Sequence, residues 1–261
     1  AHVRAELPEL ELADVTGRFQ RLRTVKSQEE IAWLKKAAEL TDRAIVALAE
    51  GARPGMTDVE LVALAEAAYR PAGGMPRIMF LRSMAMDDPN GCLPAQNPSR
   101  RKIEAGDVII TEFSASYWGY TGQIQRPIFV AAEPTAEWQE LFDVALASYE
   151  AIRGILRPGT TEAEVIEAAE PIRAAGLDIY DDLVHGYGVD IMPPIVDRTQ
   201  LRHPPENGGA RFEQDTAIVI QPNPVTSDER MGLQLGELTV VREGGAESLH
   251  GVPLEPLIAA A

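Results

Sequence analysis

The chain contains an internal repeat, and this repeat limits the fold more than any other feature of the sequence. Residues 53–60 read Arg-Pro-Gly-Met-Thr-Asp-Val-Glu, and residues 157–164 read Arg-Pro-Gly-Thr-Thr-Glu-Ala-Glu. In each copy Pro-Gly follows a long helix, and Thr-x-x-Glu is the capping box that begins a second helix. The sequence therefore predicts two units of helix, turn, helix and strands, related by a pseudo-twofold axis. Two such units would form a curved sheet backed by helices, which is an α+β fold.

A second constraint comes from residues 106–130, which have the pattern of a β-hairpin. Residues 108–113 are β-forming with apolar side chains on both faces, as in a central strand, and residues 124–130 return as the second strand. Because side chains alternate along a strand, Glu112 shares a face with apolar neighbours and points toward an interior. A carboxylate there needs a partner, and Gln123 on the return strand is the expected one.

Periodicity and capping signals place the other elements. Ser27 and Glu30 form a further capping box, which begins a helix that is expected to run to about Ala49. A second long helix is predicted over residues 136–156. Strands are predicted over 7–12, 79–81 and 216–221, and connections over 15–23 and 195–215.

The hairpin resembles the signature of the creatinase, prolidase and methionine aminopeptidase family, which has the pita-bread fold. The matching residues are Gly106-Asp107, Tyr117-Trp118-Gly119-Tyr120, Ile124 and Arg126. Further matches follow in the family's order: His185-Gly186-Tyr187-Gly188, Gln221-Pro222 and residues 232–241. The resemblance extends over about residues 21–250 and implies the pita-bread fold, with two pseudo-symmetric units around a curved sheet.

The resemblance also implies where the two metal ions of the family would bind. The five ligand positions fall on Glu112, Gln123, His185, Gln221 and Gly236. A site for two dications needs several anionic oxygens, and an ordinary catalytic zinc uses three protein ligands. One carboxylate and one imidazole are too few, so the sequence predicts no metal and no other cofactor.

The same residues are candidates for a site that works without metal. His185 is the candidate general acid or base, because a pKa near 6.5 suits proton transfer at neutral pH; the alternative is a histidine in a structural turn. Glu112 is the second catalytic candidate, and its alternative is a buried carboxylate satisfied by Tyr120 or by backbone N–H groups. Amides transfer protons poorly, so Gln123 and Gln221 are candidate substrate-binding residues.

Two further residues are candidates for binding the substrate. Tyr120 stands at the hairpin tip, where its ring either packs or forms a wall for a cationic ligand. Glu237 either anchors a cationic group or is a charge at the edge of a strand.

Three functions follow from the resemblance. The first is a metal-independent, creatinase-like hydrolase that cleaves a C–N bond of a small polar or cationic substrate. The second is a catalytically inactive pita-bread binding or scaffold protein. The third, which the ligand positions disfavour, is an Xaa-Pro-type metallopeptidase. An open pocket beside Glu112 and His185 would favour an enzyme, whereas polar groups paired among themselves would favour a binding protein.

Composition narrows the choice of partner to a small molecule. The formal net charge of −16 argues against a nucleic-acid backbone as the partner. No apolar run of about 18 residues occurs, so no membrane partner is expected. The single cysteine, Cys92, suits a reducing compartment, and the sequence shows no signal-peptide pattern. Both features favour the cytoplasm as the location.

The beginning of the chain suggests a domain boundary. Residues 21–31 resemble the entry to the catalytic domain in two-domain members of the family. Residues 1–20 are therefore expected to be the trailing end of an N-terminal domain or a linker, and residues 21–261 the pita-bread catalytic-type domain. The resemblance also implies a homodimer.

Overall fold

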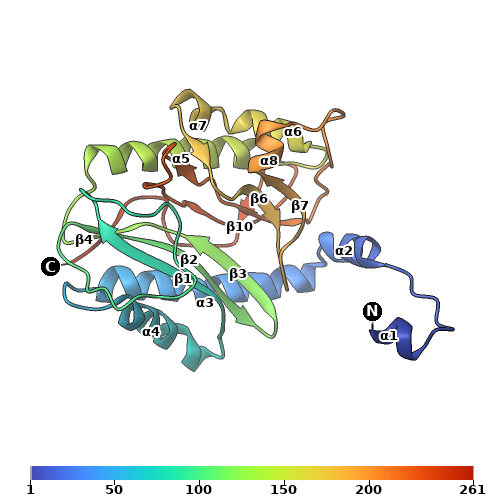
Figure 1. Ribbon diagram of the computed structural model, residues 1–261, viewed down its shortest axis with the longest axis horizontal. Coiled ribbons are helices and arrows are strands. Elements are labelled where there is room, and N and C mark those ends of the chain that lie inside the picture. Colours follow the sequence, from blue (N-terminus) through green and yellow to red (C-terminus); the bar gives the residue numbers. More distant parts are fainter. Residues whose placement is uncertain (1, 261) are drawn as a thin grey trace.

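The computed structural model describes residues 2–260, and its core is a large mixed sheet covered by helices (Figure 1). The strands of this sheet are β1 Met75–Ala85, β2 Asp107–Tyr117, β3 Tyr120–Gln125, β4 Ile128–Val130, β6 Asp182–Gly186, β7 Met192–Asp197, β8 Ala217–Ile220, β10 Gly236–Val240, β11 Glu247–Ser248 and β12 Leu257–Ala259. Their order is β12-β4-β2-β3-β10-β8-β6-β7, with β1 paired to β2 and β11 paired to β10. Only β12 and β4 run parallel. Strands β5 Asp178–Ile179 and β9 Pro224–Val225 form a separate pair.

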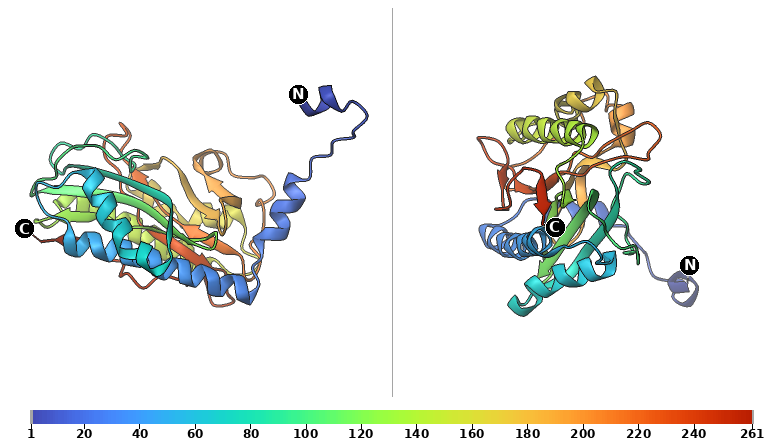
Figure 2. Two further views of the ribbon diagram at one scale, coloured as in Figure 1. Left: turned by 90° about the horizontal axis from the view of Figure 1, so that it is seen from below. Right: turned by 90° about the vertical axis from the view of Figure 1, so that its left-hand side faces the viewer.

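Helices cover the sheet in two groups, which Figure 2 shows from two further directions. The helices are α1 His2–Glu6, α2 Thr16–Thr24, α3 Gln28–Gly51, α4 Asp58–Tyr69, α5 Ala136–Ile155, α6 Glu162–Ala168, α7 Glu170–Ala174 and α8 Arg198–Arg202, with a 3₁₀ turn at Arg70–Ala72. The helix α3 lies directly on β2 and β3, where a Cβ on Gly122 would be 2.4 Å from the backbone of Ala38. Thr41 Oγ1 closes this contact by donating to the carbonyl of Gly122 at 2.8 Å.

The two repeat units form matching structures, as the sequence predicts. The capping boxes of Thr57 with Glu60 and of Thr161 with Glu164 begin α4 and α6. In the first unit Gly55 N donates to the carbonyl of Ile103; in the second Gly159 N donates to that of Phe212. The bridges of Thr57 to Lys102 and of Thr161 to Arg211 also correspond. The pseudo-twofold relation is therefore present in the hydrogen bonds as well as in the sequence.

The central hairpin is present, but its return strand β3 begins at Tyr120, and residues 128–130, predicted as part of that strand, form the separate strand β4. The strand β2 is buried from Asp107 to Ala115, and Phe113 pairs with Ile124 of β3. The two strands meet in a two-residue turn of Trp118 and Gly119, with φ of 51° and 90°. Positive φ at both positions is the geometry that suits the twist of a tight hairpin.

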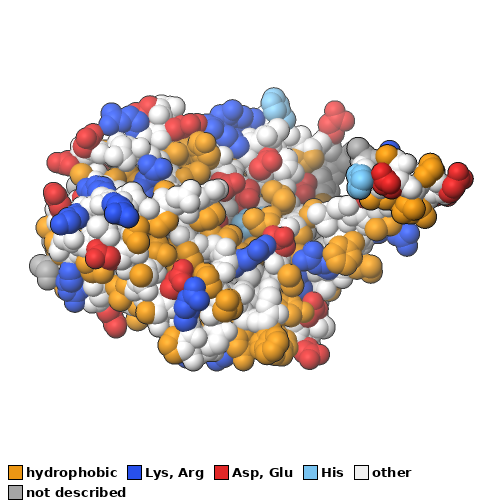
Figure 3. All heavy atoms as spheres, turned by 60° about the horizontal axis from the view of Figure 1, so that its bottom comes forward, with side chains coloured by type: hydrophobic (Ala, Val, Ile, Leu, Met, Phe, Trp, Pro, Cys, Tyr) orange, Lys and Arg blue, Asp and Glu red, His pale blue; other side chains and the backbone are white. Residues whose placement is uncertain are grey.

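The N-terminal segment differs from the sequence prediction. The strand predicted over 7–12 is absent, because this segment is exposed and pairs with no other strand. Residues 16–24, predicted as a connection, form α2, which begins where Asp14 Oδ1 accepts from Thr16 N at 2.9 Å. Neither α1 nor α2 has a buried residue; α2 lies beside β7, while the end that contains α1 projects from the body with apolar side chains on its surface (Figure 3).

The connection predicted over residues 195–215 is partly regular. The strand β7 runs to Asp197, and the short helix α8 follows it. Asp197 caps this helix by accepting from Thr199 N and Gln200 N. A cap of this kind can begin a helix inside a polar segment that lacks an apolar stripe. Within residues 2–260, no helix combines the length and the apolarity needed to cross a membrane.

Candidate functional site

The five family positions meet on one face of the main sheet. Glu112 lies on β2, Gln123 on β3 and His185 on β6, while Gln221 directly follows β8 and Gly236 begins β10. The four side chains are at most 8% exposed. The structure therefore brings together the residues that the resemblance assigns to the reaction centre.

Hydrogen bonds join these side chains and two neighbours into one group, the central cluster, whose members are Glu112, Gln123, Gln125, Asp182, His185 and Gln221. Gln123 Nε2 donates to Glu112 Oε1 at 2.9 Å and to Gln221 Oε1 at 3.2 Å. His185 Nε2 lies 3.2 Å from Gln123 Oε1, and His185 Nδ1 lies 2.9 Å from Asp182 Oδ1. Gln221 Nε2 also donates to Asp182 Oδ1, at 3.1 Å. The cluster thus pairs its own polar groups.

Both ring nitrogens of His185 lie within hydrogen-bonding distance of an oxygen atom. Gln123 uses its amide N–H groups toward Glu112 and Gln221, so its oxygen accepts from His185 Nε2, while Asp182 accepts from Nδ1. An imidazole that donates from both nitrogens is protonated. Burial lowers the pKa of His185, but the charge and the hydrogen bond of Asp182 outweigh burial and place the pKa above its usual value. Both the hydrogen bonds and the neighbouring carboxylates therefore favour the protonated form of His185.

Two carboxyl groups near His185 hold protons more tightly than usual. Burial raises the pKa of Glu112 to about 7, although the positive charge of His185 opposes the rise. The pKa of Asp181 is raised by partial desolvation of its carboxyl group and then by the charge of Asp182, although the residue as a whole is exposed. A raised carboxyl pKa shows that nearby positive charge does not fully compensate the loss of water around the acid.

Two amides at the centre have unused hydrogen-bonding atoms. Among the described residues, neither amide atom of Gln234 has a partner, although the residue is only 1% exposed and lies close enough to Glu112 to lower its pKa. Gln125 Nε2 donates to Gln221 Oε1 at 2.7 Å, but Gln125 Oε1 is unpaired. A Cβ on Gly236 would lie 3.0 Å from this oxygen. Gln125 therefore occupies space into which a side chain at position 236 would extend.

Glu237 lies away from the central cluster, which corrects its placement as a substrate-binding residue. It forms a buried ion pair with Arg126 and accepts from the hydroxyl of Tyr149 at 2.9 Å. Burial raises the pKa of Glu237, but the charge of Arg126 outweighs burial and the pKa is lowered. Side chains alternate along β10, so Glu237 faces the opposite side of the sheet from Gly236. Its role here is structural.

Tyr120 is also placed outside the central cluster. Its hydroxyl donates to Glu30 Oε1 at 3.3 Å, and its ring is stacked with Trp33 at 6.5 Å between centroids. It therefore fixes the hairpin against α3 and does not satisfy Glu112, which is bound by Gln123 instead.

Sequence reasoning missed three residues of the centre. Asp182 lies three positions before His185, and Gln125 and Gln234 lie two positions from Gln123 and Gly236. The period of two along a strand predicts that these amides share a face with the family positions. That signal was present in the sequence for Gln125 and Gln234, whereas only the structure shows that Asp182 orients His185.

A family model for metallopeptidase family M24 matches residues 32–243. The chain belongs to this family. Its fold is the pita-bread fold, because an X-Pro aminopeptidase from Thermotoga maritima superposes on 98% of this chain with a TM-score of 0.85 at 24% identity, over 70% of its own length. The Xaa-Pro aminopeptidase of Escherichia coli is 26% identical over 87% of this chain. The probable dipeptidase PepE of Mycobacterium tuberculosis is 28% identical over 93%.

The chain spans only part of these relatives, namely 56% of the Escherichia coli protein and 63% of the Mycobacterium tuberculosis protein. Their names nevertheless correct the functional expectation. The relatives are named Xaa-Pro aminopeptidase and probable dipeptidase, and these names favour peptides as the substrates. The prediction of a metal-independent, creatinase-like hydrolase that acts on a small C–N compound is therefore wrong. The family is one of peptidases, which are hydrolases.

The side chains at the centre do not fit the paired metal ions of this family. Two of the five positions carry neutral amides and one carries glycine, which leaves Glu112 and His185. One carboxylate and one imidazole supply fewer ligands than a catalytic metal site with three protein ligands. Across residues 2–260, no group of three or more His, Cys, Asp or Glu side chains is arranged to hold a metal ion.

Proposed function

We propose that the domain binds a short peptide of the Xaa-Pro type at the central cluster and does not hydrolyse it with the metal pair of its family. The central cluster supports this proposal, because amides stand where anionic ligands are needed and are hydrogen-bonded to one another. If the chain is a binding protein that has lost its catalytic metal ions, the polar groups of the old reaction centre would be hydrogen-bonded to one another in this way.

The unused groups at the centre suggest how a peptide would be held. Gln234 offers one acceptor and two donors, which match the N–H and C=O of a peptide group. Burial raises the pKa of Glu112, and the ammonium group of a peptide would supply the missing positive charge. Recognition of both groups would select short peptides with a free amino terminus.

The relatives support a second function, a metal-dependent Xaa-Pro peptidase. Their names describe this activity, and the chain shares their fold. The amides of Gln123 and Gln221 and the missing side chain of Gly236 weigh against it, because they remove the anionic oxygens that two dications require.

Calorimetric titration with the dipeptide L-alanyl-L-proline tests the proposed function. We expect saturable binding and no release of free proline. Replacing Gln234 by leucine should weaken binding about tenfold or more, because a hydrogen-bonded polar group is worth about 1 to 3 kcal/mol when its partner is left unpaired. Gln28→Leu, at an exposed position on α3, is the matched control and should bind as the parent does.

Two outcomes would contradict this proposal. Proline released in proportion to added Mn²⁺ would establish the metallopeptidase function instead. No binding of the dipeptide by a folded protein would remove the Xaa-Pro peptide as the ligand class.

A further inference from the structure

Phe80 on β1 lies directly beside Glu112 in the main sheet. The two residues are cross-strand partners in the antiparallel pair of β1 and β2. Partners of this kind project from the same face of a sheet, with their Cβ atoms about 4.5 to 5.5 Å apart. Phe80 therefore flanks the central cluster on the β1 side of Glu112, whereas Gln123 binds Glu112 from β3 on the other side.

The hydrophobic core does not use the ring of Phe80. Among the described residues, this side chain packs in none of the apolar clusters that form the core, and no aromatic ring stacks on it. Its neighbours Met79 and Leu81 pack in the cluster under α3 and α4, on the opposite face of β1. Phe80 is half-buried, so its ring can take an apolar group of a ligand.

Glu112 has one carboxylate oxygen left for a ligand. Its Oε1 atom accepts from Gln123 Nε2 at 2.9 Å. Its Oε2 atom forms no hydrogen bond within residues 2–260, yet it is not fully buried, so it reaches the surface of the site. A carboxylate oxygen in this position can take an ammonium group through a charge-assisted hydrogen bond.

We propose that Phe80 selects the first residue of the bound peptide and favours an apolar side chain there. This inference rests on the proposed function, in which the free amino terminus of an Xaa-Pro peptide binds at Glu112. When the ammonium group lies on Glu112 Oε2, the side chain on the adjacent carbon is within reach of a ring whose Cβ stands about 5 Å from that of Glu112. Phe80 thus determines specificity, because its ring covers a leucine side chain and leaves little to gain for an alanine.

Calorimetric titration of the full chain with L-leucyl-L-proline and L-alanyl-L-proline tests the inference. The two ligands have the same charges and the same proline, and they differ only in the first side chain. Burial of part of the added apolar surface on the ring should make L-leucyl-L-proline bind about tenfold tighter. Phe80→Ala should reduce this preference to about twofold or less, and should leave the affinity for L-alanyl-L-proline within about threefold of the parent.

Two further variants make the result specific to the ring. Phe80→Thr should lose the preference as Phe80→Ala does, and its β-branched side chain suits a strand, so it supplies the measurement if Phe80→Ala does not fold. Met75→Ala removes an apolar side chain from the exposed beginning of the same strand and should keep the tenfold preference. The readout is a ratio of two affinities of one protein, which a purely structural role of Phe80 would not change.

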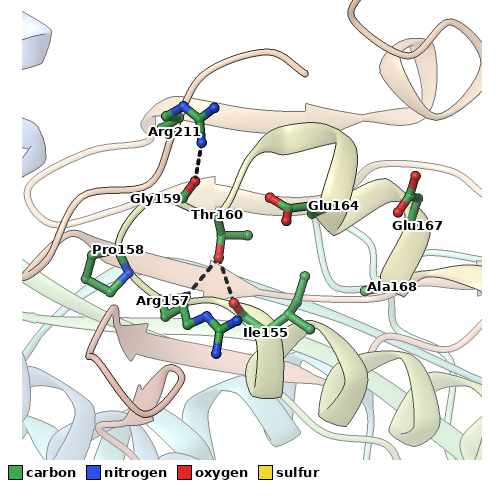
Figure 4. Close-up of a pocket in the computed structure, with 9 residues that line it drawn as sticks. All are labelled: Ile155, Arg157, Pro158, Gly159, Thr160, Glu164, Glu167, Ala168 and Arg211. Carbon is green, nitrogen blue, oxygen red and sulfur yellow. Dashed lines mark hydrogen bonds between the residues drawn. The ribbon is translucent and has the colours of Figure 1, made fainter. Parts of the chain in front are cut away.

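A groove of about 570 Å³ beside α6 is not expected to bind these dipeptides (Figure 4). Arg157 and Arg211 lie on opposite sides of the turn at residues 157–160, and Glu167 lies at the far end of the groove on α6. Arg211 Nη1 is also held by the carbonyl of Gly159, at 2.8 Å. Because these charges do not converge on one ligand, Arg157→Gln should leave both affinities unchanged.

The outcomes separate the inference from the proposed function. If both dipeptides bind the parent equally well, or if Phe80→Ala and Phe80→Thr keep the tenfold preference, the inference is overturned while the proposed function stands. If neither dipeptide binds the folded parent, the proposed function fails and the inference falls with it.

Discussion

Gly236→Ala is expected to destabilise the domain by about 3 kcal/mol or more. The added Cβ would lie 2.1 Å from the carbonyl oxygen of Ile220 and 2.6 Å from Cα of Gln221. Both are backbone atoms, so β8 and β10 would have to move apart at the point where Glu237 pairs with Ile220. Overpacking a rigid interior costs about 1 to 3 kcal/mol, and more where the backbone must shift.

Denaturant unfolding of Gly236→Ala and the parent measures this cost. Gly154→Ala is the matched control, because a Cβ there meets nothing within 4 Å on helix α5. Because alanine is more favourable than glycine inside a helix, Gly154→Ala should raise the free energy of unfolding by roughly 0.5 to 1 kcal/mol. If the free energy of unfolding of Gly236→Ala lies within about 1 kcal/mol of that of the parent, β8 and β10 do not approach each other this closely at position 236. The close approach also explains why a carboxylate cannot be restored at this position by a single substitution.

Glu112→Gln is expected to stabilise the domain at about pH 8.5 by up to about 3 kcal/mol, and to have little effect near pH 4.5. Burial raises the pKa of Glu112 from 4.5 to about 7, so the folded state holds a proton that the unfolded state releases. The contribution of Glu112 to stability is therefore greatest below pH 4.5 and is lost as the pH rises through 7. Each unit of pKa difference corresponds to about 1.4 kcal/mol.

Thermal unfolding from pH 4.5 to 8.5 checks this expectation. The glutamine oxygen can still accept from Gln123 Nε2, so the variant removes the ionisation and keeps the hydrogen bond. The parent should lose roughly 6 to 12 °C of melting temperature relative to the variant across this range. A variant that is less stable than the parent at alkaline pH would show that Glu112 is held in its ionised form, as a metal ligand would be.

The sequence was sufficient to predict the architecture. The repeat carries its own capping boxes, and the structure adds matching hydrogen bonds from Gly55 and Gly159 to segments about 50 residues further along the chain, at Ile103 and Phe212. Local signals of this kind survive in any sequence that keeps the fold. The alternation of side chains on β2 likewise placed Glu112 beside Gln123.

The chemistry of the centre was only partly predictable. The face to which Glu237 turns depends on the register of β10, and a shift of one residue moves a side chain to the other side of the sheet. The pairing of His185 with Asp182 depends on the directions of several amides, which no spacing in the sequence specifies. The strand expected over residues 7–12 does not form, because a strand needs a hydrogen-bonded partner strand and this segment has none.

Incubation with Mn²⁺, Co²⁺ or Zn²⁺, removal of the free ion and elemental analysis of the protein test whether the central cluster holds a metal. Because Gln123, Gln221 and Gly236 supply no anionic oxygen, we expect no stoichiometric metal and no release of proline from L-alanyl-L-proline. One or two ions retained per chain, with proline released in proportion to the metal retained, would contradict this expectation.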